Sequence, residues 1–216
     1  MLDRASLTLQ THFVITHSIG AISLGTIEAP TDGSAVYYTY YNVVASSGLT
    51  CTMIMGKVST SSPALEWQKK AVATSGYSAW CLFPADIVAY DSSTVYFTAT
   101  FPSTSDSDVA AVMKASPDGT FTTYEAFGST DSKTFLFNFI AAGGFFYFHG
   151  VSGKTEFQVA SRDGLFLVKT NLDFANDQCT QINQHSVTIS VVTDTDTTFT
   201  DAASMTDMSF ATVSLT

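Results

Sequence analysis

The four histidines are the side chains of this 216-residue chain best suited to metal binding or acid–base chemistry. They are His12, His17, His149 and His185, and only the first two lie near each other in sequence. A metal site needs ligands that converge in space, and a spacing of five places His12 and His17 on opposite faces of a strand. We therefore expect no metal site there, and we interpret His149, which follows an aromatic run, as a strand-end residue with a hydrogen-bonded ring.

Three aspartates in the C-terminal part of the chain, Asp194, Asp196 and Asp201, offer the oxygen ligands that calcium prefers. The glycine and the terminal glutamate of an EF-hand loop are absent from this stretch. The pattern favours a polar strand and turn with solvated carboxylates, and a calcium site is the alternative. We predict no metal and no cofactor for the chain.

Catalytic motifs are absent from the sequence. It contains no G-x-S-x-G, P-loop or G-x-G-x-x-G pattern. Serine and threonine are so frequent that a Ser-His-Asp triad composed by choice has no weight. The paired carboxylates of a glycosidase are recognised by geometry, and nothing marks out the four glutamates, Glu28, Glu66, Glu125 and Glu156. We expect no catalytic residues and predict that the protein is not an enzyme.

The three cysteines are Cys51, Cys81 and Cys179, and this odd number leaves at least one of them outside any disulfide within the chain. None forms a C-x-x-C pair, which argues against a zinc or thioredoxin-like site. We interpret them as small, half-buried apolar residues. A Cys51–Cys81 disulfide in an oxidising compartment is the alternative.

The charge balance excludes two classes of partner. Lysine and arginine number 9 against 19 acidic residues, for a net charge of −10. Binding to nucleic acid or to an anionic membrane needs clustered basic residues, and the lysines here are scattered along the chain.

The longest apolar stretch, residues 135–148, is too short to span a bilayer. We predict two strands there, joined by a turn at Gly143 and Gly144.

The first 20 residues do not form a signal peptide, because Asp3 stands beside Arg4 and no unbroken apolar core follows. The chain is then either cytoplasmic or a mature or partial sequence. Few lysines among abundant Ser, Thr and Asp favour an extracellular or cell-surface location.

Strand signals dominate the chain. Phenylalanine (17) and tyrosine (9) are plentiful, and aromatic and β-hydroxyl residues favour pleated strands. The clearest unit is a β-hairpin over Ala110–Tyr124, in which Pro117 presets φ, Asp118 can bond its own backbone and Gly119 accepts a positive φ. The one candidate helix is the short segment Pro63–Ala73.

Three segments, residues 22–70, 79–126 and 134–181, share a pattern of strands. Each contains an aromatic strand and then an apolar strand that ends in lysine, namely Lys57, Lys114 and Lys169, at spacings of 57 and 55 residues. Trp67, Tyr124 and Cys179 each follow ten positions later. A turn of similar kind precedes each aromatic strand: Thr31-Asp32-Gly33, Asp91-Ser92-Ser93 and Gly143-Gly144.

An antiparallel four-stranded unit of about 50 residues is typical of a propeller blade. Strands in the flanks, residues 1–21 and 182–216, would complete a fourth unit, with strand-like runs at Val187–Val192 and Phe210–Leu215. The C-terminal strands would close the fold or pair with a neighbouring subunit. We therefore predict an all-β fold of about four blade-like repeats, a small or partial β-propeller. A β-sandwich or jelly roll is the alternative.

The segments VMKASPDGTFTTY, FLVKTNLDFANDQC and GKVSTSSPALEWQ resemble the tandem β-propeller repeats of large secreted bacterial and protist surface proteins. In that family a strand ends in Lys, a D-x-D-G-type turn follows, and the next strand carries Trp or a substitute. The resemblance covers residues 22–181, although only the second repeat keeps Asp-Gly at this turn and only the first keeps Trp. It implies an extracellular adhesive or structural role and carries over no catalytic residues.

Two functions fit these observations. The first is a non-catalytic structural or interaction protein that forms a homo-oligomer, filament or surface layer, with Phe210–Leu215 completing the sheet of the next subunit. The alternative is a carbohydrate-binding propeller, or a fragment of a polysaccharide-active enzyme. Exposed Tyr38, Tyr40, Trp80 and Phe148 would then stack on a glycan, although we prefer core packing for these aromatics. Neither hypothesis involves nucleic acid or membrane insertion.

Overall fold

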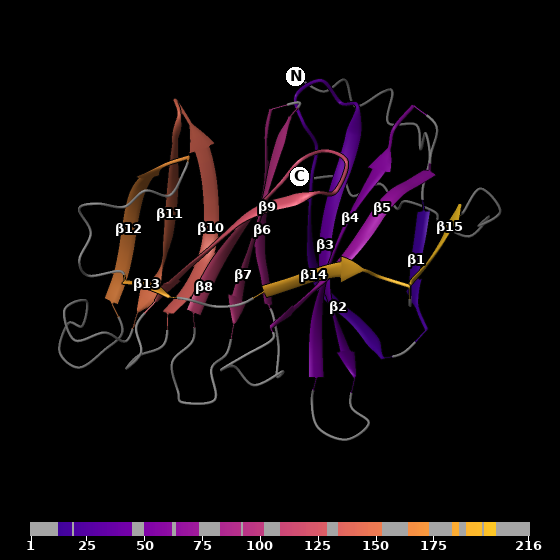
Figure 1. Cartoon of the computed structure of the whole chain (residues 1–216), viewed down its shortest axis with the longest axis horizontal. Coiled ribbons are helices and arrows are strands. Elements are labelled where there is room, and N and C mark those ends of the chain that lie inside the picture. Colours follow the sequence, from indigo (N-terminus) through magenta and orange to yellow (C-terminus); the bar gives the residue numbers. More distant parts are fainter. Residues whose placement is uncertain are drawn as a thin grey trace, which may run out of the picture.

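The chain folds into antiparallel β-sheets in a computed structural model (Figure 1). The structure describes residues 13–18, 20–44, 50–61, 64–73, 83–91, 93–101, 109–128, 134–152, 164–172, 183–185, 189–195 and 197–201. Within these ranges every regular element is a strand, so the predicted all-β, antiparallel fold is confirmed. No helix long and apolar enough to cross a membrane occurs in the described part of the chain.

The first sheet is a meander of four consecutive strands with a fifth strand added at its edge. Its order is β14-β5-β4-β3-β2. The strands are β2 (Ala21–Glu28), β3 (Ala35–Val44), β4 (Thr50–Ser59), β5 (Ala64–Ala73) and β14 (Ile189–Thr193). The candidate helix at Pro63–Ala73 is therefore wrong, because β5 pairs with both β4 and β14 and these pairings override the local preference of its Ala, Leu, Glu and Lys for helix.

The second sheet repeats this plan, and the third repeats it with three strands. The second has the order β13-β9-β8-β7-β6 and the third β10-β11-β12. The strands of the second sheet are β6 (Phe83–Asp91), β7 (Thr94–Phe101), β8 (Val109–Ala115), β9 (Phe121–Gly128) and β13 (Asn183–His185). The third sheet contains β10 (Thr134–Ala142), β11 (Phe145–Ser152) and β12 (Gly164–Asn171). The predicted pair of strands joined at Gly143 and Gly144 is confirmed as β10 and β11.

The repeat holds at the level of single residues. In each sheet the lysine near the end of one strand lies directly opposite a tyrosine of the aromatic strand, and its ammonium lies over the tyrosine ring. The pairs and the distances from Nζ to ring centroid are Tyr37–Lys57 at 5.9 Å, Tyr96–Lys114 at 5.8 Å and Tyr147–Lys169 at 5.7 Å. A register shift follows the lysine in both the first and the second sheet. The three lysines therefore occupy equivalent positions, as their spacing predicts.

The predicted aromatic phase is wrong by one residue. Lys57 lies opposite Trp67, but Lys114 lies opposite Thr123, so that Tyr124 pairs with Met113 instead. The segment from Lys114 to its cross-strand partner is one residue shorter than the segment from Lys57 to Trp67. A slip of one residue moves a side chain to the other face of a strand. Cys179, the third member of the predicted set, lies outside the described residues.

The three sheets stack front to back. We call the face that carries the Tyr–Lys pair the front face of a sheet, and the opposite one its back face. The front face of the first sheet packs on the back face of the second, where Tyr37 meets the ring of Phe97 edge-on at 6.5 Å. The front face of the second sheet packs on the third, where Tyr96 meets Phe146 at 4.3 Å. Figure 1 shows the stack, with the β1–β15 pair beyond the first sheet.

The strands of the two flanks are divided among three sheets. β13 extends the second sheet, β14 extends the first, and β1 (Phe13–His17) pairs with β15 (Thr197–Asp201). The strands β13 and β14 each cover a sheet edge that would otherwise expose unpaired backbone groups. The predicted fourth four-stranded unit is therefore not formed by the described strands, which also show no closed ring or barrel. The segment Phe210–Leu215 lies outside the described residues.

Candidate functional site

The candidate histidine and calcium ligands do not converge in the described part of the chain, where no group of three or more His, Cys, Asp or Glu side chains gathers. His149 is half-buried in β11, and His17 and His185 belong to β1 and β13 in different sheets. Asp194 follows β14, whereas Asp201 ends β15 opposite Phe13. His12 and Asp196 lie outside the described residues.

The solvated carboxylate expected at Asp194 is wrong, because its side chain is fully buried. It accepts a hydrogen bond of 2.6 Å from Nε2 of Gln68, whose Oε1 accepts one from the Tyr38 hydroxyl. Burial raises the pKa of Tyr38, so this hydroxyl remains a donor. The Lys70 ammonium lies 3.9 Å from the second carboxylate oxygen. This network joins the segment after β14 to the back face of the first sheet, and no local motif in the sequence reveals it.

Three aromatics nominated for glycan stacking are buried: Tyr38, Tyr40 and Phe148. Tyr38 stacks on Tyr40 at 6.1 Å, and Phe148 stacks on Phe139 at 5.5 Å within the third sheet. The preferred prediction of core packing is therefore confirmed for these three, and the exposure that the carbohydrate-binding alternative needs is not found, since alternation along β3 and β11 places them on packed faces. Trp80 lies outside the described residues.

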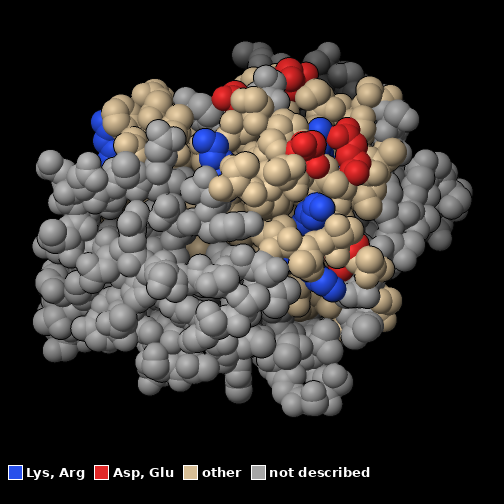
Figure 2. All heavy atoms as spheres, in the orientation of Figure 1, with Lys and Arg blue, Asp and Glu red and all other residues tan. Residues whose placement is uncertain are grey.

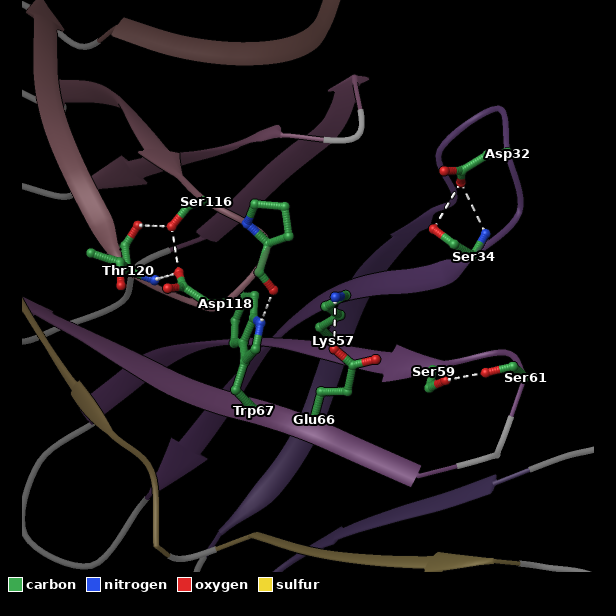
Figure 3. A network of polar contacts seen from close by, with 11 residues as sticks. Asp32, Ser34, Lys57, Ser59, Ser61, Glu66, Trp67, Ser116, Asp118 and Thr120 are labelled. Carbon is green, nitrogen blue, oxygen red and sulfur yellow. Dashed lines mark hydrogen bonds and ion pairs between the residues drawn. The ribbon is translucent and has the colours of Figure 1, made fainter.

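The glutamates and cysteines that the structure describes lie on different strands and form no common site. Glu66, at the register shift of β5, forms an ion pair of 2.6 Å with Lys57 (Figure 3), while Glu28 is exposed at the end of β2. Glu125 lies in β9 and Cys51 in β4, and the structure describes only their backbone. Glu156, Cys81 and Cys179 lie outside the described residues, as does the candidate Cys51–Cys81 disulfide.

Three hairpin turns share an aspartate cap that the sequence shows as D-x-S or D-x-T. In each turn an aspartate Oδ1 accepts a hydrogen bond from the backbone N–H two residues later, at 2.7–3.0 Å. The caps are Asp32 with Ser34, Asp91 with Ser93 and Asp118 with Thr120 (Figure 3 shows the first and third). The predicted hairpin at Ala110–Tyr124 is thus confirmed, with Gly119 at φ 82°.

These caps lower the pKa of all three carboxyls below the ordinary 3.8. The Ser116 hydroxyl and the Thr120 N–H hold the pKa of Asp118 down, and the Ser34 N–H and hydroxyl do the same for Asp32. Burial pushes the pKa of Asp91 upward, but its hydrogen bonds from Ser93 and Thr94 outweigh that effect. A carboxyl with a lowered folded pKa stabilises the fold above its unfolded pKa, and this contribution is lost as the pH falls through the folded pKa.

We therefore expect acid to weaken the turn at Asp118. Asp118→Asn keeps an acceptor oxygen but cannot ionise, so it should be less stable than the wild type at pH 7. The difference should shrink as the pH falls below about 3.8, the ordinary pKa of this carboxyl. Urea unfolding midpoints of both proteins across that range measure it. A difference that stays constant with pH would show that the charge of Asp118 contributes nothing.

Among the described residues, most of the large apolar side chains that are exposed to solvent lie on the front face of the third sheet. Burial alternates strictly along β12, and its outward residues Leu165 and Leu167 are 73% and 77% exposed. Ile140 of β10, on the same face but two strands away, is 58% exposed. The Lys169 ammonium lies over the Phe145 ring at 3.8 Å, so the cation adds an aromatic contact to this face.

A shallow hollow of about 320 Å³ indents this front face. It lies across all three strands, and its lining is mostly apolar, with an amide and an imidazole at one side. The lining residues are Asn138, Ile140, Tyr147, Phe148, His149 and Leu167. The face therefore carries both projecting apolar side chains and a recess, which are features of a contact surface.

Among the described residues, the front face of the third sheet is the candidate site that the geometry supports. The comparisons with known proteins add no relative to guide its interpretation. Searches against family models, curated proteins and solved structures found no match for this chain.

Proposed function

We propose that the protein is a non-catalytic structural or interaction protein that assembles with copies of itself through the front face of its third sheet. An extracellular or cell-surface location belongs to the same proposal, supported by the scarcity of lysine and the abundance of Ser, Thr and Asp in the sequence. The strand contact predicted for Phe210–Leu215 remains a separate prediction.

The observation that supports this proposal most directly is a difference in burial between the front faces of the three sheets. The front faces of the first and second sheets are buried at Tyr37, Met55, Tyr96 and Val112, because each packs on the sheet that follows it. The same face of the third sheet leaves its leucines exposed. Contiguous exposed apolar surface of this kind typically marks a protein contact site. Each exposed leucine that becomes buried in a contact contributes about 1.5–3 kcal/mol.

We expect Leu167→Glu to abolish self-association, because a carboxylate would have to leave water on entering the contact. The matched control is Ile27→Glu on β2, since Ile27 is 76% exposed and lies in a different sheet. Sedimentation velocity over a concentration series should show association of the wild type and the control, and a monomer for Leu167→Glu. A wild type that stays monomeric throughout would contradict the proposal.

A further inference from the structure

We infer that the front face of the third sheet pairs with the same face of a second copy, giving a closed two-fold dimer and not an open filament. This inference rests on the proposed function and names the partner surface and the symmetry of the contact.

The two ends of the stack differ. A filament made by continuing the front-to-back stacking needs a free back face at one end to receive the front face of the next copy. In the described part of the chain, the middle of the back face of the first sheet is covered, since Tyr38, Tyr40 and Ile54 are buried. Exposed apolar side chains on this face come from its two outer strands, Ile27 of β2 and Val192 of β14. Asp194 is tied to this face through Gln68, and the β1–β15 pair lies beyond the sheet (Figure 1). The front face of the third sheet is therefore the more open end of the stack, and the same face of a second copy is its best-matching surface.

Charge also favours contact between two copies of this face. The chain carries 19 acidic residues and a net charge of −10, so two copies repel each other over most orientations. None of those carboxylates belongs to β10, β11 or β12. In the view of Figure 2, the carboxylates of the described residues lie away from the end formed by the third sheet. The strands of the third sheet therefore bring no carboxylate of their own into such a contact.

The shape of the face suits a contact with itself. In a two-fold contact the same patch of both copies meets, so that patch must carry both the side chains that project and the recess that receives them. Leu165 and Leu167 project from β12, and the hollow between Ile140, Tyr147 and His149 lies on the same face. Three strands of eight to nine residues cover roughly 14 Å by 26 Å. That is smaller than the typical area of about 800 Å² per partner, so we expect a dissociation constant in the micromolar range.

A charge-exchange experiment tests the symmetry. Leu167→Glu and Leu167→Lys are each expected to weaken the dimer. In a two-fold contact a mixture of the two variants brings one carboxylate and one ammonium into a shared interface. The mixed dimer should therefore form at least roughly tenfold more tightly than either variant alone. In a front-to-back contact each altered front face meets an unaltered back face, so mixing restores nothing.

Sedimentation from roughly 1 µM to several hundred µM separates the outcomes, with Ile27→Glu mixed with Ile27→Lys as the control. Wild-type growth that stops at the dimer, together with recovery only in the Leu167 mixture, supports the inference. Growth to longer polymers, or no recovery on mixing, overturns it and leaves self-association standing. A monomeric wild type over the whole range removes both proposals.

Discussion

Replacing Trp67 with alanine is expected to lower the free energy of unfolding by about 3 kcal/mol or more. Trp67 is the joint between the first and second sheets. It extends from β5 and reaches the turn between β8 and β9, where its indole N–H donates a hydrogen bond of 2.8 Å to the Pro117 carbonyl (Figure 3). Its ring lies against Gly119, whose missing Cβ would come within 2.8 Å of it.

Three further rings surround the same indole. Tyr37 comes from its own sheet, and Phe97 and Phe121 come from the second sheet, all with centroids 6.3 Å away. Removing the indole therefore opens a cavity at the junction of two sheets and leaves these rings without their common partner. Such cavities cost more than the lost transfer free energy alone, because the surroundings relax only partly.

Urea unfolding followed by far-ultraviolet circular dichroism measures this effect. Trp67→Phe is the matched control, since it keeps an aromatic ring and loses the N–H donor, at a cost of about 1 kcal/mol from the hydrogen bond. A loss below about 1 kcal/mol for Trp67→Ala would mean that the two sheets are held together mainly by other contacts.

The second large effect is expected at Asp194, where alanine should cost about 2–3 kcal/mol. The substitution leaves the buried amide of Gln68 without its acceptor, and an unpaired buried donor carries its full desolvation penalty. Lys70 also loses its carboxylate neighbour, but its side chain is about a quarter exposed, so water compensates for most of that loss.

A double-mutant cycle isolates this contact. Asp194→Ala, Gln68→Ala and the double variant should show a coupling of about 1 kcal/mol or more, because the two side chains bond directly. Asp194→Asn is the conservative control, since its amide oxygen still accepts from Gln68. If the two single effects simply add, the contact between the C-terminal segment and the first sheet is energetically unimportant.

The sequence by itself determined the local features of the fold. Alternation and aromatic content predicted strands, and β3, β7 and β11 are found within the segments that carried this signal. Lys57, Lys114 and Lys169 marked equivalent strand ends because a repeat keeps its spacing. The turns at Gly33, Gly119 and Gly143 followed from residue types that accept a positive φ. All of these depend on neighbours within a few residues, which a sequence displays directly.

Only the tertiary structure decided which edges and faces are used. The strand β14 extends the first sheet across more than a hundred residues of sequence, and backbone pairing of this kind leaves no trace in side-chain pattern. The same holds for Asp194. Its sequence context predicts a solvated carboxylate, and only the tertiary structure shows that it is buried and hydrogen-bonded to Gln68. Tyr124 is a related case, since the segment from Lys114 to its cross-strand partner is one residue shorter than in the first sheet and this changes the pairing of Tyr124.

The contact surface shows the same division. In the sequence, Leu165 and Leu167 are ordinary apolar strand residues. Leu167 lies two residues before Lys169, as the buried Met55 and Val112 lie two residues before the lysines of the first and second sheets. Whether such a residue is core or surface depends on whether another sheet covers it, and that is a property of the whole stack. The physical reason is that hydrophobic burial is non-directional and set by the final arrangement, whereas strands and turns are specified by short-range sterics and hydrogen bonds.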